Sequence, residues 1–206
     1  SRVHMPVAPF GENPMRVLEE FSELRTLVDA AASIGSEPDC SQLQPMHAAV
    51  FSLHATKIMG AGEGGVAVFG DASVAQKARE WADFGRSLDY THSSGINAKM
   101  SEGQAAFCLS SLRKWKYTKA LWKNAQNSAQ TIVDKHKLKI SPAGFESIHP
   151  YWIVDFQEPE TTLRVERLLW EREIQTKRWW PLSLSEVLGG APLKVSESKR
   201  QTTIGL

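Results

Sequence analysis

The sequence predicts an α/β fold followed by a smaller α+β part. Two observations lead to this prediction: short apolar runs alternate with helical patterns in the first half of the chain, and a long helical pattern opens the second half. Of the 206 residues, 42% are hydrophobic and 23% are charged, which is ordinary for a globular protein and argues against disorder. Folding at this length buries about 70% of the unfolded surface, so a core is available.

The first elements are predicted from local signals. Residues 3–7 form an apolar stretch typical of a strand. Asn13 and Pro14 are typical of the cap and the first position of a helix. A strand over residues 24–28 follows and ends at Asp29. This alternation of strand and helix places the first half in the α/β class.

Two further strands flank a glycine-rich turn. Residues 48–53 and 65–69 are short apolar runs typical of buried strands, and Asp71 can cap a helix predicted over residues 72–84. Residues 60–65 contain the pattern G-x-G-x-x-G. A dinucleotide site needs a helix directly after that pattern, whereas a strand follows here, so we interpret these glycines as a tight turn.

A long helix opens the second region. Residues 101–104, Ser-Glu-Gly-Gln, match a capping box, and apolar residues keep helical spacing as far as Trp122. We therefore expect two domains, over residues 1–105 and 106–206. After the long helix, the second domain is predicted to contain a strand, a helix and a strand, at residues 149–156, 161–174 and 175–180.

Two stretches, residues 114–123 and 177–180, combine basic and aromatic side chains, a pattern compatible with single-stranded nucleic acid. On a helix, however, Trp115 and Trp122 share one face and the lysines mostly point elsewhere, which favours a core stripe. Adjacent tryptophans on a strand point to opposite faces, so a substrate rim or an interface would explain the second stretch. The net charge of +1 gives no field that would attract nucleic acid or an anionic membrane.

Several classes of protein are disfavoured by what the sequence lacks. The six histidines show no metal-ligand spacing, and no G-x-S-x-G elbow accompanies a suitable acid and base. Cys40 and Cys108 lie in unlike contexts, so neither a disulfide framework nor a metal site is expected, and a reducing cytoplasm fits best. No apolar run approaches a membrane span, and the first residues lack the order of a signal peptide.

Lys57 and Asp29 are the residues that most suggest chemistry. Lys57 lies between two predicted buried strands, where an amine either reaches water along its alkyl stem or is held as a nucleophile. Asp29 ends an apolar strand, so we expect a partly buried carboxylate that needs a partner, with a simple cap as the alternative. Together they match the amine that forms a Schiff base with pyridoxal phosphate and the acid that holds its pyridinium nitrogen.

Three motifs follow one another over about half of the chain: Val28-Asp29-Ala30-Ala31, then Phe51-Ser52-Leu53-His54-Ala55-Thr56-Lys57 with Gly62-Glu63-Gly64-Gly65, then Gly95-Ile96-Asn97 with Met100-Ser101-Glu102 and Gln104-Ala105-Ala106. In this order they resemble the DegT/DnrJ/EryC1/StrS family of sugar aminotransferases. The resemblance implies the fold type I of pyridoxal-phosphate enzymes, with part of the large domain and a small α+β C-terminal domain. Residues 200–206 also resemble the segment near the end of that family.

By this resemblance Lys57 would form the Schiff base with pyridoxal 5'-phosphate and then act as the base that moves the substrate proton. Asp29 would pair with the pyridine nitrogen, and Ser52 would bind the cofactor phosphate. Asn97 would reach a phosphate across the interface of a homodimer. The implied reaction transfers an amino group, with glutamate as the expected donor, to a keto sugar linked to a nucleotide. No role follows for His54.

The sequence also departs from the family. Ala32 stands where the family commonly has Gln or His against the cofactor ring, and Ala98-Lys99 replaces the usual Tyr-Arg. The N-terminal part of the family has no counterpart in this sequence, so we expect this chain to be a fragment. The alternative is a non-catalytic relative or remnant that keeps the fold for binding or assembly.

Overall fold

The computed structural model covers residues 1–206 and describes all of them except 1–2, 88–93, 139, 141–146, 152, 157, 179–202 and 206. Contacts divide the chain into two units, Ser1–Lys123 with Glu146–His149, and Asn124–Phe145 with Pro150–Leu206. The domain boundary expected at residue 105 stays a prediction. Each unit is described by itself below.

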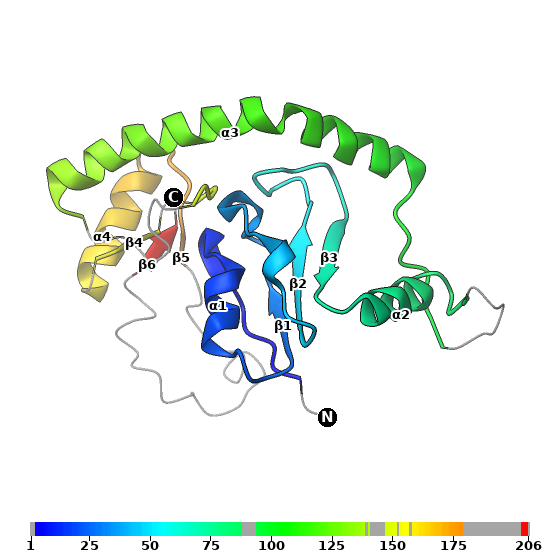
Figure 1. Ribbon diagram of the computed structural model, residues 1–206. Coiled ribbons are helices and arrows are strands. Elements are labelled where there is room, and N and C mark those ends of the chain that lie inside the picture. Colours follow the sequence, from blue (N-terminus) through cyan, green and yellow to red (C-terminus); the bar gives the residue numbers. More distant parts are fainter. Residues whose placement is uncertain are drawn as a thin grey trace. The chain divides into compact units, whose positions relative to one another are not determined.

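A three-stranded sheet forms the centre of the first unit. Its order is β1 (Thr26–Asp29), β2 (His47–Ser52) and β3 (Gly65–Phe69). β1 and β2 are parallel, whereas β2 and β3 are antiparallel (Figure 1). The strands predicted at residues 24–28, 48–53 and 65–69 are therefore present, each within two residues of its expected bounds.

The strand expected at residues 3–7 is present only as two isolated parallel bridges. His4 pairs with Thr26, and Val7 pairs with Asp29. Main-chain hydrogen bonds run along this edge of β1, and the Pro6 carbonyl accepts one of them from the Asp29 N–H, at 2.9 Å. Because proline has no N–H, Pro6 cannot return a bond to β1, and the ladder is interrupted at that residue.

The core lies against one face of the sheet. α1 (Pro14–Glu20) begins as predicted, since the Asn13 side chain accepts a hydrogen bond from the Met15 N–H at 2.9 Å. α1 buries its apolar side against strand residues that alternate along β1 and β2, as the period of two in a strand requires. The core cluster includes Val17, Leu18, Val28, Ala49 and Phe51.

The next two described helices follow β3 along the chain. α2 (Ala72–Ala82) is capped as predicted, because Asp71 accepts hydrogen bonds from the next helical N–H groups. α3 (Glu102–His136) begins in this unit, and the Ser101 hydroxyl accepts the Gln104 N–H at 3.2 Å, which is one half of the predicted capping box. Trp115 is half-buried on α3, but Leu112 is exposed, so the expected apolar core stripe is only partly present.

Short 3-10 turns connect these elements. They are η1 (Pro9–Gly11), η2 (Ile34–Ser36) and η3 (Cys40–Gln42). In the described ranges, not one of the helices carries an apolar stretch of the length that crossing a bilayer requires.

The described residues of the second unit form a small antiparallel sheet, the last part of α3 and a short helix. The sheet order is β4 (Ile153–Asp155), β6 (Thr203–Gly205) and β5 (Lys177–Arg178). The helix expected at residues 161–174 is present as α4 (Pro159–Trp170), which begins two residues earlier and ends four residues earlier. The sequence predicted β4 and β5 as longer strands and missed β6. Trp179 and Trp180, for which a substrate rim or an interface was considered, lie outside the described residues.

Candidate active site at the carboxyl edge of the sheet

Three of the predicted site residues lie at one edge of the first sheet. β1 ends at Asp29 and the parallel β2 ends at Ser52, so both residues stand at the carboxyl ends of their strands. The antiparallel β3 begins at Gly65, so the loop of residues 53–64, which carries Lys57, is at this edge too (Figure 1). In open α/β sheets, ligands bind outside the carboxyl ends of the strands.

Asp29 and Ser52 share a face of the sheet. Asp29 is in register with Val50, which lies two residues before Ser52, and side chains two apart on a strand point to the same side. This face is opposite to Val28 and the core. Asp29 is therefore exposed, and the expectation of a partly buried carboxylate was wrong. The preceding apolar residues made Asp29 look buried, but strand alternation turns it away from them.

The Asp29 carboxylate also has a local role. Its Oδ1 accepts a hydrogen bond from the Ala31 N–H at 3.0 Å, which is the turn cap considered as the alternative interpretation. In the part of the chain that the structure describes, no cation forms an ion pair with it. A carboxylate that uses one oxygen for its own turn retains acceptor capacity for a ligand.

The loop that carries Lys57 is closed by main-chain hydrogen bonds. Leu53 N–H donates to the Gly64 carbonyl at 2.9 Å, and Ala55 N–H donates to the Gly62 carbonyl at 2.7 Å. Gly62 and Gly64 have φ values of 97° and 125°, a region that side chains with a Cβ rarely adopt. β3 follows directly, so the interpretation of the glycines as a tight turn is confirmed.

The part of this loop around Lys57 is well packed. The residues around it include Leu53, Ile58 and Ala61, which are 3%, 5% and 7% exposed. The Lys57 N–H donates to the His54 carbonyl at 2.9 Å, and the Lys57 residue is half-buried. Within the described ranges, no carboxylate forms an ion pair with the Lys57 amine. The backbone of Lys57 is thus held by the turn, and among the described residues no carboxylate competes for its amine.

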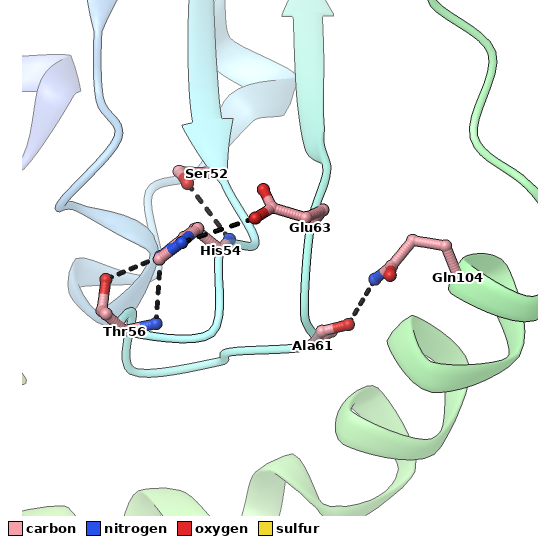
Figure 2. A network of polar contacts seen from close by, with 6 residues as sticks. All are labelled: Ser52, His54, Thr56, Ala61, Glu63 and Gln104. Carbon is pink, nitrogen blue, oxygen red and sulfur yellow. Dashed lines mark hydrogen bonds and ion pairs between the residues drawn. The ribbon is translucent and has the colours of Figure 1, made fainter.

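His54, three residues before Lys57 in the sequence, is the centre of a polar network with Ser52, Thr56 and Glu63 (Figure 2). Its Nδ1 lies 2.8 Å from Thr56 Oγ1 and accepts the Thr56 N–H at 3.2 Å. Its Nε2 lies 3.6 Å from Glu63 Oε1. Its own N–H donates to Ser52 Oγ at 3.2 Å. No role for His54 was predicted from the sequence, although its position three residues before Lys57 and the acid Glu63 within the glycine turn were visible signals.

The loop is also fastened to α3. The Gln104 side chain donates from Nε2 to the Ala61 carbonyl oxygen (Figure 2), and the Ser111 hydroxyl donates to the Gly60 carbonyl oxygen at 3.1 Å. From the sequence, Gln104 was placed in a capping box and in a family motif, but no contact was predicted for its side chain, which bridges 43 positions of sequence.

Asn97 is not brought to the other three predicted residues within this chain. It is exposed and forms an isolated antiparallel bridge with Asp83, at the C-terminal end of α2. α2 follows the end of β3, and that end is at the opposite edge of the sheet from Lys57. The role expected for Asn97 across a subunit interface stays a prediction.

The sequence profile of the DegT/DnrJ/EryC1/StrS aminotransferase family matches residues 3–190. The chain belongs to this family. Among solved structures, DesI in the presence of its TDP-sugar product is 26% identical, with a TM-score of 0.74, and the match covers 100% of this chain and 57% of DesI. The chain therefore spans well under two thirds of that relative.

Two further members of this fold are more distant in sequence. A putative PLP-dependent aminotransferase from Bacillus cereus ATCC 10987 is 21% identical over 98% of this chain and 59% of its own, with a TM-score of 0.77. NtdA from Bacillus subtilis, with bound cofactor PMP, is 16% identical over 100% of this chain and 51% of its own, with a TM-score of 0.71. The chain thus has the α/β fold of the fold type I aminotransferases.

Proposed function

We propose that the protein to which this chain belongs is a pyridoxal-phosphate-dependent aminotransferase, which transfers an amino group from glutamate to a keto sugar carried on a nucleotide. The observation that carries the proposal is the placement of Asp29, Ser52 and the Lys57 loop at one carboxyl edge of the sheet. Membership of the aminotransferase family supports the reaction. The TDP-sugar in the DesI structure supports the class of substrate.

The side chains at this edge fit pyridoxal phosphate. When bound, the cofactor supplies an aldehyde for an amine and an electron-withdrawing ring that stabilises negative charge at the substrate Cα. The Lys57 amine would hold the cofactor covalently, and after its displacement by the substrate amine it would move the proton from the substrate Cα to the cofactor carbon. The exposed Asp29 carboxylate would hold a proton on the ring nitrogen.

Ser52 is arranged to donate a hydrogen bond to an anion. Its Oγ already accepts the His54 N–H at 3.2 Å, so the hydroxyl proton stays available for another acceptor. A hydroxyl offers one donor and two acceptor positions, and a phosphate oxygen offers acceptors only. Ser52 would therefore contribute a donor to the cofactor phosphate at the end of β2.

The remaining contacts to cofactor and substrate would come from outside this chain. The match covers 57% of DesI, and the part that this chain does not span would supply the rest of the cofactor site. Asn97 would contribute from one subunit of a homodimer to the site of the other, because its own chain does not bring it to Lys57. We place the enzyme in the cytoplasm, where its two cysteines would stay reduced.

Covalent labelling tests the proposal. The chain is mixed with pyridoxal phosphate, reduced with borohydride and digested, and the modified lysine is identified by mass spectrometry. We expect a visible absorption band that borohydride shifts, with the label on Lys57. Lys57→Ala should abolish both, and Lys99→Ala is the matched control, because Lys99 is an exposed lysine paired with Asp83. Labelling spread evenly over exposed lysines, or unchanged in Lys57→Ala, would refute cofactor binding by this chain and favour a binding or assembly role.

A further inference from the structure

The turn that carries Lys57 is built around the three polar groups of His54. The His54 N–H donates to Ser52 Oγ at 3.2 Å, and the His54 carbonyl accepts the Lys57 N–H at 2.9 Å. The ring Nδ1 accepts the Thr56 N–H at 3.2 Å. His54 is thus joined to the residue two before it and to those two and three after it. A side chain that accepts the N–H two residues later closes a turn of this kind, as the Asp29 carboxylate also does.

The bond from the Thr56 N–H indicates which nitrogen of the imidazole carries the proton. A backbone N–H can only donate, so the Nδ1 that accepts the Thr56 N–H carries a lone pair and no proton. The Thr56 hydroxyl, 2.8 Å from the same nitrogen, then donates to it as well. In the neutral ring the proton is on Nε2. If the proton moved to Nδ1, that nitrogen would donate to the Thr56 hydroxyl instead, and the turn would lose the bond from the Thr56 N–H.

Glu63 lies where its charge favours the proton on Nε2 of His54. Its Oε1 lies 3.6 Å from His54 Nε2, which is longer than a hydrogen bond, so the carboxylate acts through its charge on the N–H that faces it. The two side chains are 81% and 44% exposed, respectively, and solvent therefore weakens the interaction. Glu63 biases the tautomer, whereas the bond from Thr56 to Nδ1 holds the turn.

We propose that His54 is the positioning residue for Lys57: its unprotonated Nδ1, favoured by Glu63 across the loop, holds the Thr56–Lys57 turn and thereby the direction of the lysine amine. The proposal rests on the proposed function, because the amine must be held for the cofactor aldehyde. His54 itself touches neither cofactor nor substrate in this role. A lysine fixed before the reaction needs less ordering when the bond forms.

Two substitutions separate the two ring nitrogens. In His54→Asn the amide oxygen is as many bonds from Cβ as Nδ1, so it can still accept from Thr56. In His54→Gln the terminal amide reaches the position of Nε2, so the group facing Glu63 is kept and the acceptor for Thr56 is lost. His54 is 44% exposed, so neither change buries a new polar group.

The test combines a measurement without cofactor and one with it. Hydrogen exchange of the Thr56 and Lys57 amides reports the turn, and the pyridoxal phosphate concentration that half-labels Lys57 reports the amine. A neutral hydrogen bond contributes about 1 kcal/mol, so we expect His54→Gln to speed exchange and to weaken labelling by about fivefold to tenfold. His54→Asn should stay within about twofold of the unchanged chain, and nitrogen-15 spectra of the unchanged chain should show the proton of His54 on Nε2.

The outcomes separate this inference from the proposed function. If the unchanged chain takes no label on Lys57, the proposed function fails, while the exchange rates still report on His54. If the unchanged chain is labelled and His54→Gln equals it in exchange and in labelling, the positioning role is refuted and the function stands. If His54→Asn is as impaired as His54→Gln, Nδ1 is not the group that matters, and the proposal is likewise overturned.

Discussion

Replacing Gly60 by alanine should disturb the Lys57 loop directly. A Cβ at this position would lie 2.4 Å from the Ala55 carbonyl oxygen and 3.0 Å from the Lys57 carbonyl oxygen. Both are main-chain atoms, so no side chain can rotate away from the new methyl group. Since a real Cβ essentially never approaches another atom within 3.0 Å, the turn must open by roughly 0.6 Å on the Ala55 side. The hydrogen bond from the Lys57 N–H to the His54 carbonyl lies in the same turn and would be strained as well.

Overpacking of this kind costs about 1–3 kcal/mol. For a chain of this size each kcal/mol lowers Tm by about 2–4 °C, so Gly60→Ala should lower it by about 2–12 °C in thermal unfolding followed by circular dichroism. Gly103→Ala is the matched control, because a Cβ there meets nothing within 4 Å and Gly103 lies inside α3. Alanine favours the helix by about 0.5–1 kcal/mol, so this control should raise Tm. A Gly60→Ala variant as stable as the unchanged chain would refute the packing of the Lys57 loop.

Three further predictions concern the scaffold. Leu18 is 2% exposed in the core, so Leu18→Ala should destabilise the chain by about 2–5 kcal/mol in urea unfolding, and a loss below 1 kcal/mol would contradict its core position. The fully buried Ser33 donates from its hydroxyl to the Ala8 carbonyl at 2.9 Å, so Ser33→Ala should cost about 1–3 kcal/mol by leaving that oxygen unpaired, whereas an unchanged urea midpoint would exclude the bond. The Lys119 ammonium lowers the pKa of the Glu37 carboxyl below its ordinary 4.5, so this contact should stabilise the fold above that pH and be lost as the pH falls through the lowered pKa. Because both side chains are at least a third exposed, the effect should stay below about 1 kcal/mol, measured as the difference in Tm between the unchanged chain and Glu37→Gln from pH 6 to pH 3.

The sequence predicted well those elements whose signals are local. Residues 65–69 were expected as a strand and form β3 with the same bounds, because a glycine turn and a capping aspartate limit the run on both sides. The cap at Asn13 was visible for the same reason, since a cap and its N–H donor lie two residues apart. By contrast, β6 has three residues and pairs with β4, about 50 positions earlier, and no local pattern marks a strand of that length.

The candidate site was predictable in its members but not in its geometry. The identity and order of Asp29, Ser52 and Lys57 came from motifs. The exposure of Asp29 did not, because the face on which a strand residue lies depends on register with a neighbour, here Val50 of β2. The bond from Gln104 to Ala61 was equally invisible, since it joins a helix to a loop 43 positions earlier. Contacts of this range depend on the fold as a whole rather than on local preference.

The Lys57 loop is constrained from several sides at once, which explains its composition. The loop must return to β3 beside β2, and the bond from Leu53 N–H to the Gly64 carbonyl requires the glycine conformation at φ 125°. A Cβ at Gly62 would come within 2.9 Å of the Gln104 Oε1. The absence of a side chain at Gly62 therefore leaves room for the Gln104 side chain of α3 to bind the loop. These glycines thus allow one specific loop conformation and do not make the loop flexible. Because Gly62 is tied by α3 and Gly64 by the backbone, the backbone on which Lys57 stands is constrained. This constraint is what the proposed covalent role of the amine would require, since among the described residues no carboxylate pairs with it.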